Sequence, residues 1–152
     1  AGRKAMAIIM FVKQLSVFME NRPGRLAEIT DVLSKNGIDI RALNIADTTD
    51  FGILRLIVSG PVKAESILRE NSMTASITEV IAVSIEDSVG AFNYMISCLK
   101  DENISIEYIY SFIGEKSAKA MIVLKTSDIK TSVKILRDHK VNVMTAKEVY
   151  DF

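Results

Sequence analysis

The chain has 152 residues, of which 49% are hydrophobic and 25% are charged, a composition typical of globular proteins that bury a core. Nineteen basic residues balance nineteen acidic ones and no apolar run reaches the length of a membrane span, so we expect neither a nucleic-acid partner nor a membrane partner. The single cysteine, Cys98, cannot form an internal disulfide, which favours a reducing, cytoplasmic location.

The first regular pattern begins near residue 10, and we expect residues 1–9 to be a leader or N-terminal extension. Leu15, Val17 and Met19 then form an alternating apolar run, and this period of two predicts a strand with one buried face. Beyond Gly24 the apolar positions follow a helical period. Gly37 predicts the end of this helix, because glycine suits the left-handed position that follows a helix.

The same half of the chain continues with a predicted hairpin. Residues 38–45 and 53–58 are strand-like and are joined by a polar turn at 47–50, a pattern typical of antiparallel pairs. The sequence at 59–61, Ser-Gly-Pro, predicts the start of a second helix. A β-rich stretch around 73–79 completes the order βαββαβ.

The second half of the chain repeats this order 66 residues later, with Gly90 in the place of Gly24. The repeated features are a strand at 81–85, a helix from 92, a helix stop at Asn103, strands at 104–110 and 121–124 with a polar turn at 115–117, a helix opened by Ser127-Asp128, and a β-rich stretch at 141–150. We therefore predict an α+β fold of two tandem ferredoxin-like modules, residues 10–79 and 80–152. Each module would have an antiparallel sheet with helices on one face.

The stretch Asn21-Arg22-Pro23-Gly24-Arg25-Leu26 resembles the Asn/Asp-x-Pro-Gly-x-Leu turn of ACT domains. Residues 34–40 resemble the family's passage into its second strand, whereas the second copy keeps Asp87 and Gly90 but has Val89 in place of proline. The chain is similar to the regulatory domains of serine-pathway dehydrogenases and of acetolactate synthase small subunits. The resemblance implies a regulatory protein that binds an amino acid or related effector between modules.

The turn before the first helix is the candidate ligand site. Backbone N–H groups at a helix start attract a carboxylate, Pro23 would set φ near the helical value, and Gly24 would let a ligand approach the backbone. The resemblance implies that Asp39 contacts the ligand, where its carboxylate would hold an α-ammonium, and Ser105 is its equivalent in the second copy. The predicted ligand-binding residues are Asn21, Arg22, Pro23, Gly24, Arg25, Leu26, Asp39, Asp87, Ser88, Val89, Gly90 and Ser105.

Two alternatives concern these loops. The first turn could simply cap a helix, and the second could only support an interface between modules. Arg22 and Arg25 are interpreted equally well as solvated surface or as ligand contacts.

The sequence contains no catalytic constellation, so we expect no enzyme activity, no cofactor and no metal. His139 is the only histidine and lies near a predicted helix end, where a solvated or dipole-stabilised side chain is the ordinary explanation. Cys98 lies on a predicted helix face and is interpreted as a packing residue and not as a nucleophile, and one histidine gives no support for a catalytic triad. Zinc-ligand spacing and a phosphate-binding glycine loop are both missing from the sequence. The aromatic stripe of Tyr108, Tyr110 and Phe112 is interpreted as packing and not as an RNA-binding surface.

Three functions remain: an amino-acid sensor, a regulatory subunit of a separate biosynthetic enzyme, and a structural dimerisation module. We also expect a homodimer, because one module does not obviously bury its aromatic residues, and closed two-fold pairing is the commonest way to cover them. The residues that support this expectation are Phe11, Phe18, Tyr108, Tyr110 and Phe112.

Overall fold

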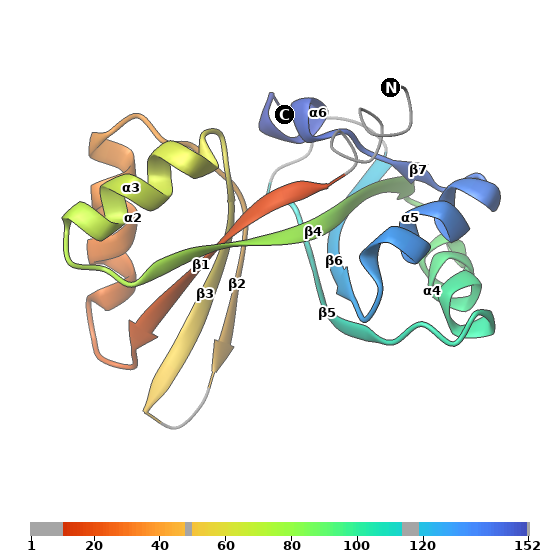
Figure 1. Cartoon of the computed structure of the whole chain (residues 1–152), viewed down its shortest axis with the longest axis horizontal. Coiled ribbons are helices and arrows are strands. Elements are labelled where there is room, and N and C mark those ends of the chain that lie inside the picture. The colour runs from red at the N-terminus through yellow and green to blue at the C-terminus, as the bar shows by residue number, and fades with distance from the viewer. Residues whose placement is uncertain (1–10, 48–49, 114–118, 152) are drawn as a thin grey trace. The chain divides into compact units, whose positions relative to one another are not determined.

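The computed structural model describes residues 11–47, 50–113 and 119–151, so the proposed leader and the predicted turn at 115–117 lie outside the described residues. The chain forms two compact units. The first contains residues 13–78 together with Tyr150 and Asp151, and the second contains residues 79–149 together with Phe11 and Val12. The change from one unit to the other falls within a single strand, β4 (Ala75–Glu86) (Figure 1).

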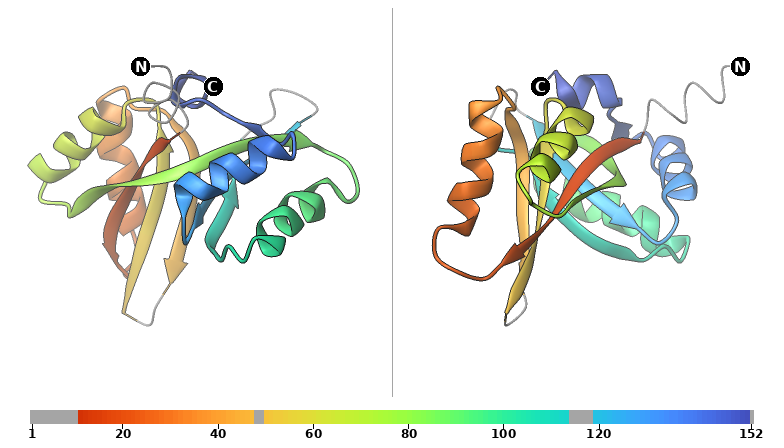
Figure 2. Two further views of the ribbon diagram at one scale, coloured as in Figure 1. Left: turned by 45° about the vertical axis from the view of Figure 1, so that its right-hand side comes forward. Right: turned by 60° about the vertical axis from the view of Figure 1, so that its left-hand side comes forward.

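The first unit has the predicted order of elements. Its helices and strands are β1 (Val12–Glu20), α2 (Arg25–Lys35), β2 (Ile40–Asp47), β3 (Phe51–Val58), α3 (Pro61–Glu70) and the first part of β4. The sheet order is β2-β3-β1-β4, and β3 is antiparallel to both β1 and β2. The two helices lie on the same face of this sheet (Figures 1 and 2).

Alternating residues of the strands form the core of the first unit. Leu15 and Val17 of β1 face Leu56 and Leu54 of β3 in the register of the sheet, and all four are fully buried. They pack in one cluster with Ile29 and Leu33 of α2 and Leu68 of α3. The period of two in β1 and the helical period after Gly24 are therefore confirmed.

The second unit repeats the pattern with the rest of β4, α4 (Ala91–Asp101), β5 (Ile106–Ser111), β6 (Lys119–Thr126), α5 (Ile129–Asp138), β7 (Asn142–Val143) and α6 (Ala146–Tyr150). Strand β6 lies between β4 and β5 and is antiparallel to both, and β7 is antiparallel to β4. The core contains Ile81, Val83, Met95, Leu99, Leu124 and Leu136. Cys98 is 5% exposed within it, which confirms a packing role.

Helices α2, α3, α4 and α5 all end in the same way. A residue with positive φ follows each helix, and the next amide donates to a carbonyl oxygen five residues back, as Ile38 does to Leu33 (3.0 Å) and Ile104 to Leu99 (3.0 Å). Gly37 (φ 71°) and Asn103 (φ 60°) confirm the predicted helix stops. The other two positions, Ser72 and Lys140, carry no sequence signal, because serine and lysine rarely adopt this conformation.

The final β-rich stretches of both copies differ from the prediction. In the first copy the stretch is not a separate strand, because β4 continues from Ala75 to Glu86. In the second copy only Asn142–Val143 is a strand, and helix α6 follows. A capping box starts this helix: the Glu148 amide donates to Thr145 Oγ1 (3.1 Å), and the Thr145 amide donates to Glu148 Oε1 (3.2 Å).

The aromatic residues that led us to expect a homodimer are mostly not exposed. Tyr110 and Phe112 are each 9% exposed, and Phe11 and Tyr108 are half-buried. Phe18 alone of the five is well exposed, at 45%. The burial of Tyr110 and Phe112 agrees with their interpretation as packing residues and removes them from the argument for a homodimer. The homodimer itself stays a prediction.

Candidate functional site

The loop between β1 and α2 is a tight turn that ends at the helix. Gly24 has φ 84° and ψ −10°, and the Arg25 amide donates to the Arg22 carbonyl oxygen (3.3 Å). These values match the third position of a type II turn, in which proline is favoured at the second position. Pro23 therefore belongs to the turn that precedes the helix.

The start of α2 leaves backbone donors available. Gly24 is the residue before the helix and provides no side-chain cap, and the first bond along the helix runs from the Glu28 amide to the Gly24 carbonyl oxygen (3.0 Å). The amides of Leu26 and Ala27 therefore have no partner within the helix. A side chain added at Gly24 would meet no atom within 4 Å. A small anion could approach this backbone closely.

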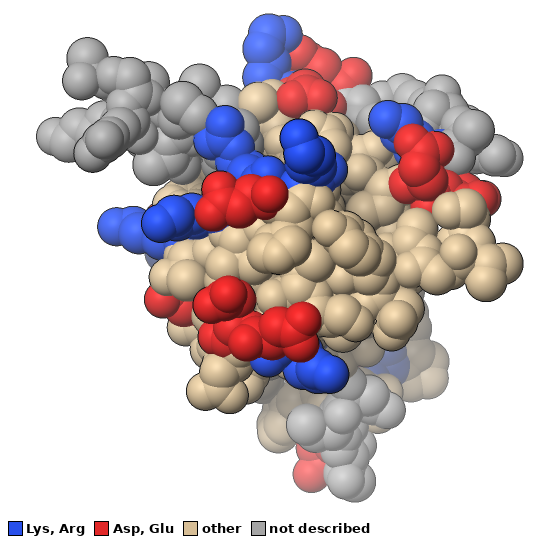
Figure 3. Space-filling view, turned by 90° about the vertical axis from the view of Figure 1, so that its right-hand side faces the viewer, with Lys and Arg blue, Asp and Glu red and all other residues tan. Residues whose placement is uncertain are grey.

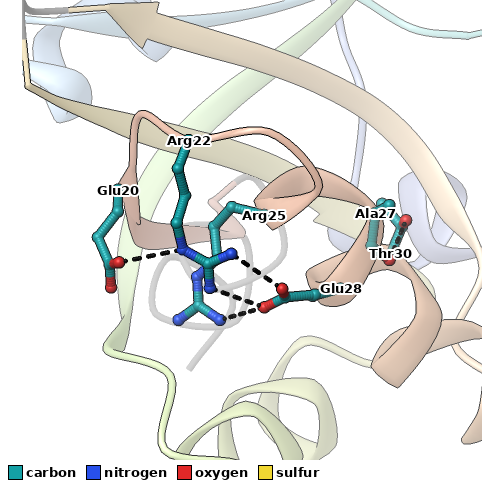
Figure 4. Close-up of polar contacts among 6 residues, drawn as sticks. All are labelled: Glu20, Arg22, Arg25, Ala27, Glu28 and Thr30. Carbon is teal, nitrogen blue, oxygen red and sulfur yellow. Dashed lines mark hydrogen bonds and ion pairs between the residues drawn. The ribbon is translucent and has the colours of Figure 1, made fainter.

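Four charged side chains surround the turn (Figure 4). Arg22 donates from Nη1 and Nη2 to the two carboxylate oxygens of Glu28 (3.0 and 3.1 Å) and from Nε to Glu20 (3.2 Å). Arg25 donates from Nη1 to Glu28 Oε2 (2.8 Å). The hydrogen bonds from Arg22, and then those from Arg25, lower the pKa of the Glu28 carboxyl, because both guanidinium groups favour its charged form.

The two arginines differ in exposure. The Arg22 side chain is 45% exposed and the Arg25 side chain is 14% exposed. The buried Nε of Arg25 has no hydrogen-bond acceptor among the described residues. Of the two interpretations given to these arginines, solvated surface thus describes Arg22 better than Arg25.

The second loop reproduces this backbone without the two arginines and without the equivalent of Glu28. Gly90 has φ 89° and ψ −13°, and the Ala91 amide donates to the Ser88 carbonyl oxygen (3.3 Å). Val89 stands in the place of Pro23 and is fully exposed, so the turn forms without proline. Tyr94 takes the place of Glu28, and its hydroxyl donates to the His139 carbonyl oxygen (3.2 Å).

Asp39 and Ser105 occupy equivalent positions in the two units. The Asp39 amide donates to Ser59 Oγ (3.0 Å), and the Ser105 amide donates to Ser127 Oγ (3.2 Å). The Asp39 carboxylate, which the resemblance implied for an α-ammonium, pairs with Arg41 (2.9 Å). Our sequence reasoning missed Arg41, although a residue two positions along an extended segment points to the same side.

Within the first unit the loop and Asp39 lie at opposite ends of α2. The helix has 11 residues and therefore rises about 16 Å along its axis, which is much longer than a single amino acid. An open hollow of about 380 Å³ lies at the Asp39 end and is lined by Thr30, Ser34, Gly37, Ile38, Asp39 and Ile40. The fold thus gathers Asn21 to Leu26 at one end of the helix and leaves Asp39 at the other.

Charges of both signs lie close together on the surface. On the face shown in Figure 3, lysine and arginine lie beside aspartate and glutamate around a broad uncharged area. Within the part of the chain that the structure describes, no helix is both long and apolar enough to cross a membrane.

A family model described as an ACT domain pair matches residues 10–152. A solved protein of Bacteroides thetaiotaomicron, BT0572, is 40% identical, with a TM-score of 0.89 over 95% of this chain and 99% of that one. The ligand-free regulatory subunit of aspartate kinase from Thermus thermophilus is 12% identical, with a TM-score of 0.60 over 86% and 97% of the two chains. No curated protein matches the sequence significantly.

Proposed function

Because the chain belongs to the ACT family as a pair of ACT domains, we propose that it is a regulatory sensor that binds an amino acid and catalyses no reaction itself. The proposed binding residues in the first module are those of the turn, Asn21 to Leu26. The ligand carboxylate lies against the start of α2, where the backbone donors and the positive end of the helix dipole favour an anion.

The observation that carries this proposal is the open backbone at Gly24. The left-handed conformation of Gly24 places an exposed turn directly before an uncapped helix, and a Cβ added at Gly24 would meet no atom within 4 Å beyond its chain neighbours. Arg22 lies in the same turn with a half-exposed guanidinium group, which can form paired hydrogen bonds with a carboxylate.

We propose that the turn of the first module binds only the carboxylate of the ligand and that the ammonium group of the ligand binds at a different position. Asp39 is the proposed contact, and it lies a full helix length from Gly24 within its own unit. A ligand that touches both positions would take the turn from one chain and Asp39 from a second copy. Binding and dimerisation would then be thermodynamically coupled. Sedimentation at micromolar concentration with and without ligand tests this, and a monomer in both conditions would exclude it.

A thermal-shift screen of the twenty amino acids tests the proposed function. Ligand at about 100 times its Kd stabilises a protein by about 2.7 kcal/mol, which raises the Tm of a domain of this size by roughly 5 to 10 °C. If no amino acid at millimolar concentration raises the Tm, the chain is not an amino-acid sensor. In that case the structural module is the better description.

Two variants locate the site once a ligand is known. Arg22→Ala removes a paired cation from the turn, and we expect it to weaken binding. Arg69→Ala is the matched control, because Arg69 is also an exposed arginine paired with a carboxylate, that of Glu65 (3.8 Å), but belongs to α3. Equal affinities of the two variants would place the site away from the turn.

A second candidate is a regulatory subunit that presents this site to a separate catalytic chain. It is favoured by the edge strand β2, on which Leu43 and Ile45 are 36% and 39% exposed, because exposed apolar side chains on a sheet edge are often covered by a partner. Affinity capture from the native host separates the two candidates. A stoichiometric biosynthetic enzyme in the captured material would identify a subunit.

A further inference from the structure

The carboxylate of Glu28 occupies the donors that a ligand carboxylate would use at the first turn. Both terminal nitrogens of Arg22 donate to it, and Arg25 donates to it as well. Figure 4 shows the two guanidinium groups converging on this one carboxylate. We infer that Glu28 is a built-in competitor at the proposed site: a ligand carboxylate binds Arg22 and Arg25 only by displacing that of Glu28. This inference rests on the proposed function, and it names a residue that sets the affinity of that site.

The contact has the geometry of ligand recognition. Arg22 and Glu28 form two parallel hydrogen bonds of 3.0 and 3.1 Å, the paired arrangement by which arginine recognises free carboxylates. The Glu28 side chain belongs to the first turn of α2 and is 46% exposed. A ligand carboxylate in its place would keep these bonds and add those of the uncapped backbone amides.

The competitor is also replaceable. Exposed ion pairs contribute little to stability, because solvent screens the charges and two long side chains must be held in place. Arg22 would still have Glu20 as a partner through its Nε (3.2 Å) after Glu28 has moved away. The Nε of Arg25 is buried and has no acceptor among the described residues in the present arrangement, so this arrangement leaves a donor unsatisfied.

The second module provides an internal comparison. Its turn has the same backbone geometry, but Ser88, Ala91 and Tyr94 stand where Arg22, Arg25 and Glu28 stand in the first. That loop therefore has neither the arginine pair nor the competing carboxylate. The competition is a property of side chains in the first module and not of the shared turn.

Acetate is a suitable probe, because it carries a carboxylate and nothing else that the site could recognise. We would titrate it into the full chain at constant ionic strength and follow the side-chain Nε–Hε NMR signals of Arg22 and Arg25. Glu28→Gln should lower the apparent Kd for acetate about fivefold, the scale of one exposed charge pair. Glu28→Ala should give at least the same effect, because glutamine can still accept one bond from Arg22.

Asp31→Asn is the matched control. Asp31 lies on the same helix and pairs with Lys35 (2.8 Å) away from the turn, so its neutralisation should leave the acetate Kd unchanged. Equal acetate affinity in the wild type and in both Glu28 variants would overturn the inference, and so would an equal gain in Asp31→Asn. The amino-acid screen decides the proposed function separately. If an amino acid binds the wild type and both Glu28 variants equally, the sensor stands and the competitor is wrong.

Discussion

Replacing Gly24 with alanine tests two properties of the first turn: the left-handed backbone, through protein stability, and the open space beside Gly24, through ligand binding. Gly24 has φ 84°, and an added Cβ would meet no atom within 4 Å. The cost of the substitution therefore comes from the left-handed backbone alone, which costs a residue with a Cβ about 1 to 2 kcal/mol. For a chain of this length, this loss lowers the Tm by roughly 2 to 8 °C.

Other glycines of the same chain provide the controls. Gly90 has φ 89° and equally open surroundings, so Gly90→Ala should lose the same stability. Gly60 has φ −141°, which any residue can adopt, and an added Cβ would make ordinary contacts with Ile38 (3.7 Å) and Lys63 (3.9 Å). Gly60 is also the N-cap of α3, where glycine is favoured over alanine, so Gly60→Ala should lose only this preference, under about 1 kcal/mol.

Thermal and urea denaturation measure these differences, and calorimetry with the ligand found in the screen measures binding. We expect Gly24→Ala and Gly90→Ala to be equally destabilised. Gly24→Ala should bind the ligand more weakly, because the methyl group enters the space that the carboxylate needs. A Gly24→Ala variant as stable as Gly60→Ala would refute the left-handed turn. Weaker binding in Gly90→Ala would show that the second loop is also a ligand site.

Three further predictions concern the second unit. Leu99→Ala should cost about 2 to 5 kcal/mol in urea unfolding, because Leu99 is fully buried in the core. Asp128→Asn should lower the Tm near pH 7 but not in strong acid. Hydrogen bonds from the hydroxyl and then the amide of Thr131 lower the pKa of the Asp128 carboxyl. The stability that the Asp128 carboxylate contributes is therefore present above the ordinary carboxyl pKa of about 4 and is lost as the pH falls through the lower pKa of the folded state. Thr145→Ala removes the capping box of α6, and amide hydrogen exchange at residues 147–150 should become faster while the rest of the unit keeps its protection.

The sequence alone predicted the features that depend on neighbouring residues. Leu15 and Val17 are two residues apart and therefore lie on the same face of a strand, because successive side chains point to opposite faces, and both are fully buried. Gly37 marked a helix end because glycine adopts a positive φ without strain. The repeat 66 residues later then gave the order of elements in the second unit, including a turn at Gly90 that keeps its geometry without proline.

The same local reasoning failed where two conformations compete. The residues after Val141 were predicted to be β-rich, but most of them form helix α6, whose capping box of Thr145 and Glu148 is a local signal that we overlooked. The end of the first copy and the start of the second were predicted as two strands. They form one strand, β4, because no residue between them interrupts the extended backbone.

Only the tertiary structure decided how the candidate site is arranged. Asp39 and Gly24 are separated by the length of α2, whereas the guanidinium group of Arg22 reaches Glu28, six residues away along the chain. Long charged side chains have many rotamers of similar energy, so the carboxylate with which an arginine pairs cannot be predicted from the sequence. The burial of Tyr110 and Phe112 was likewise decided by packing, because an alternating aromatic pattern looks the same whether its face is covered or open to water.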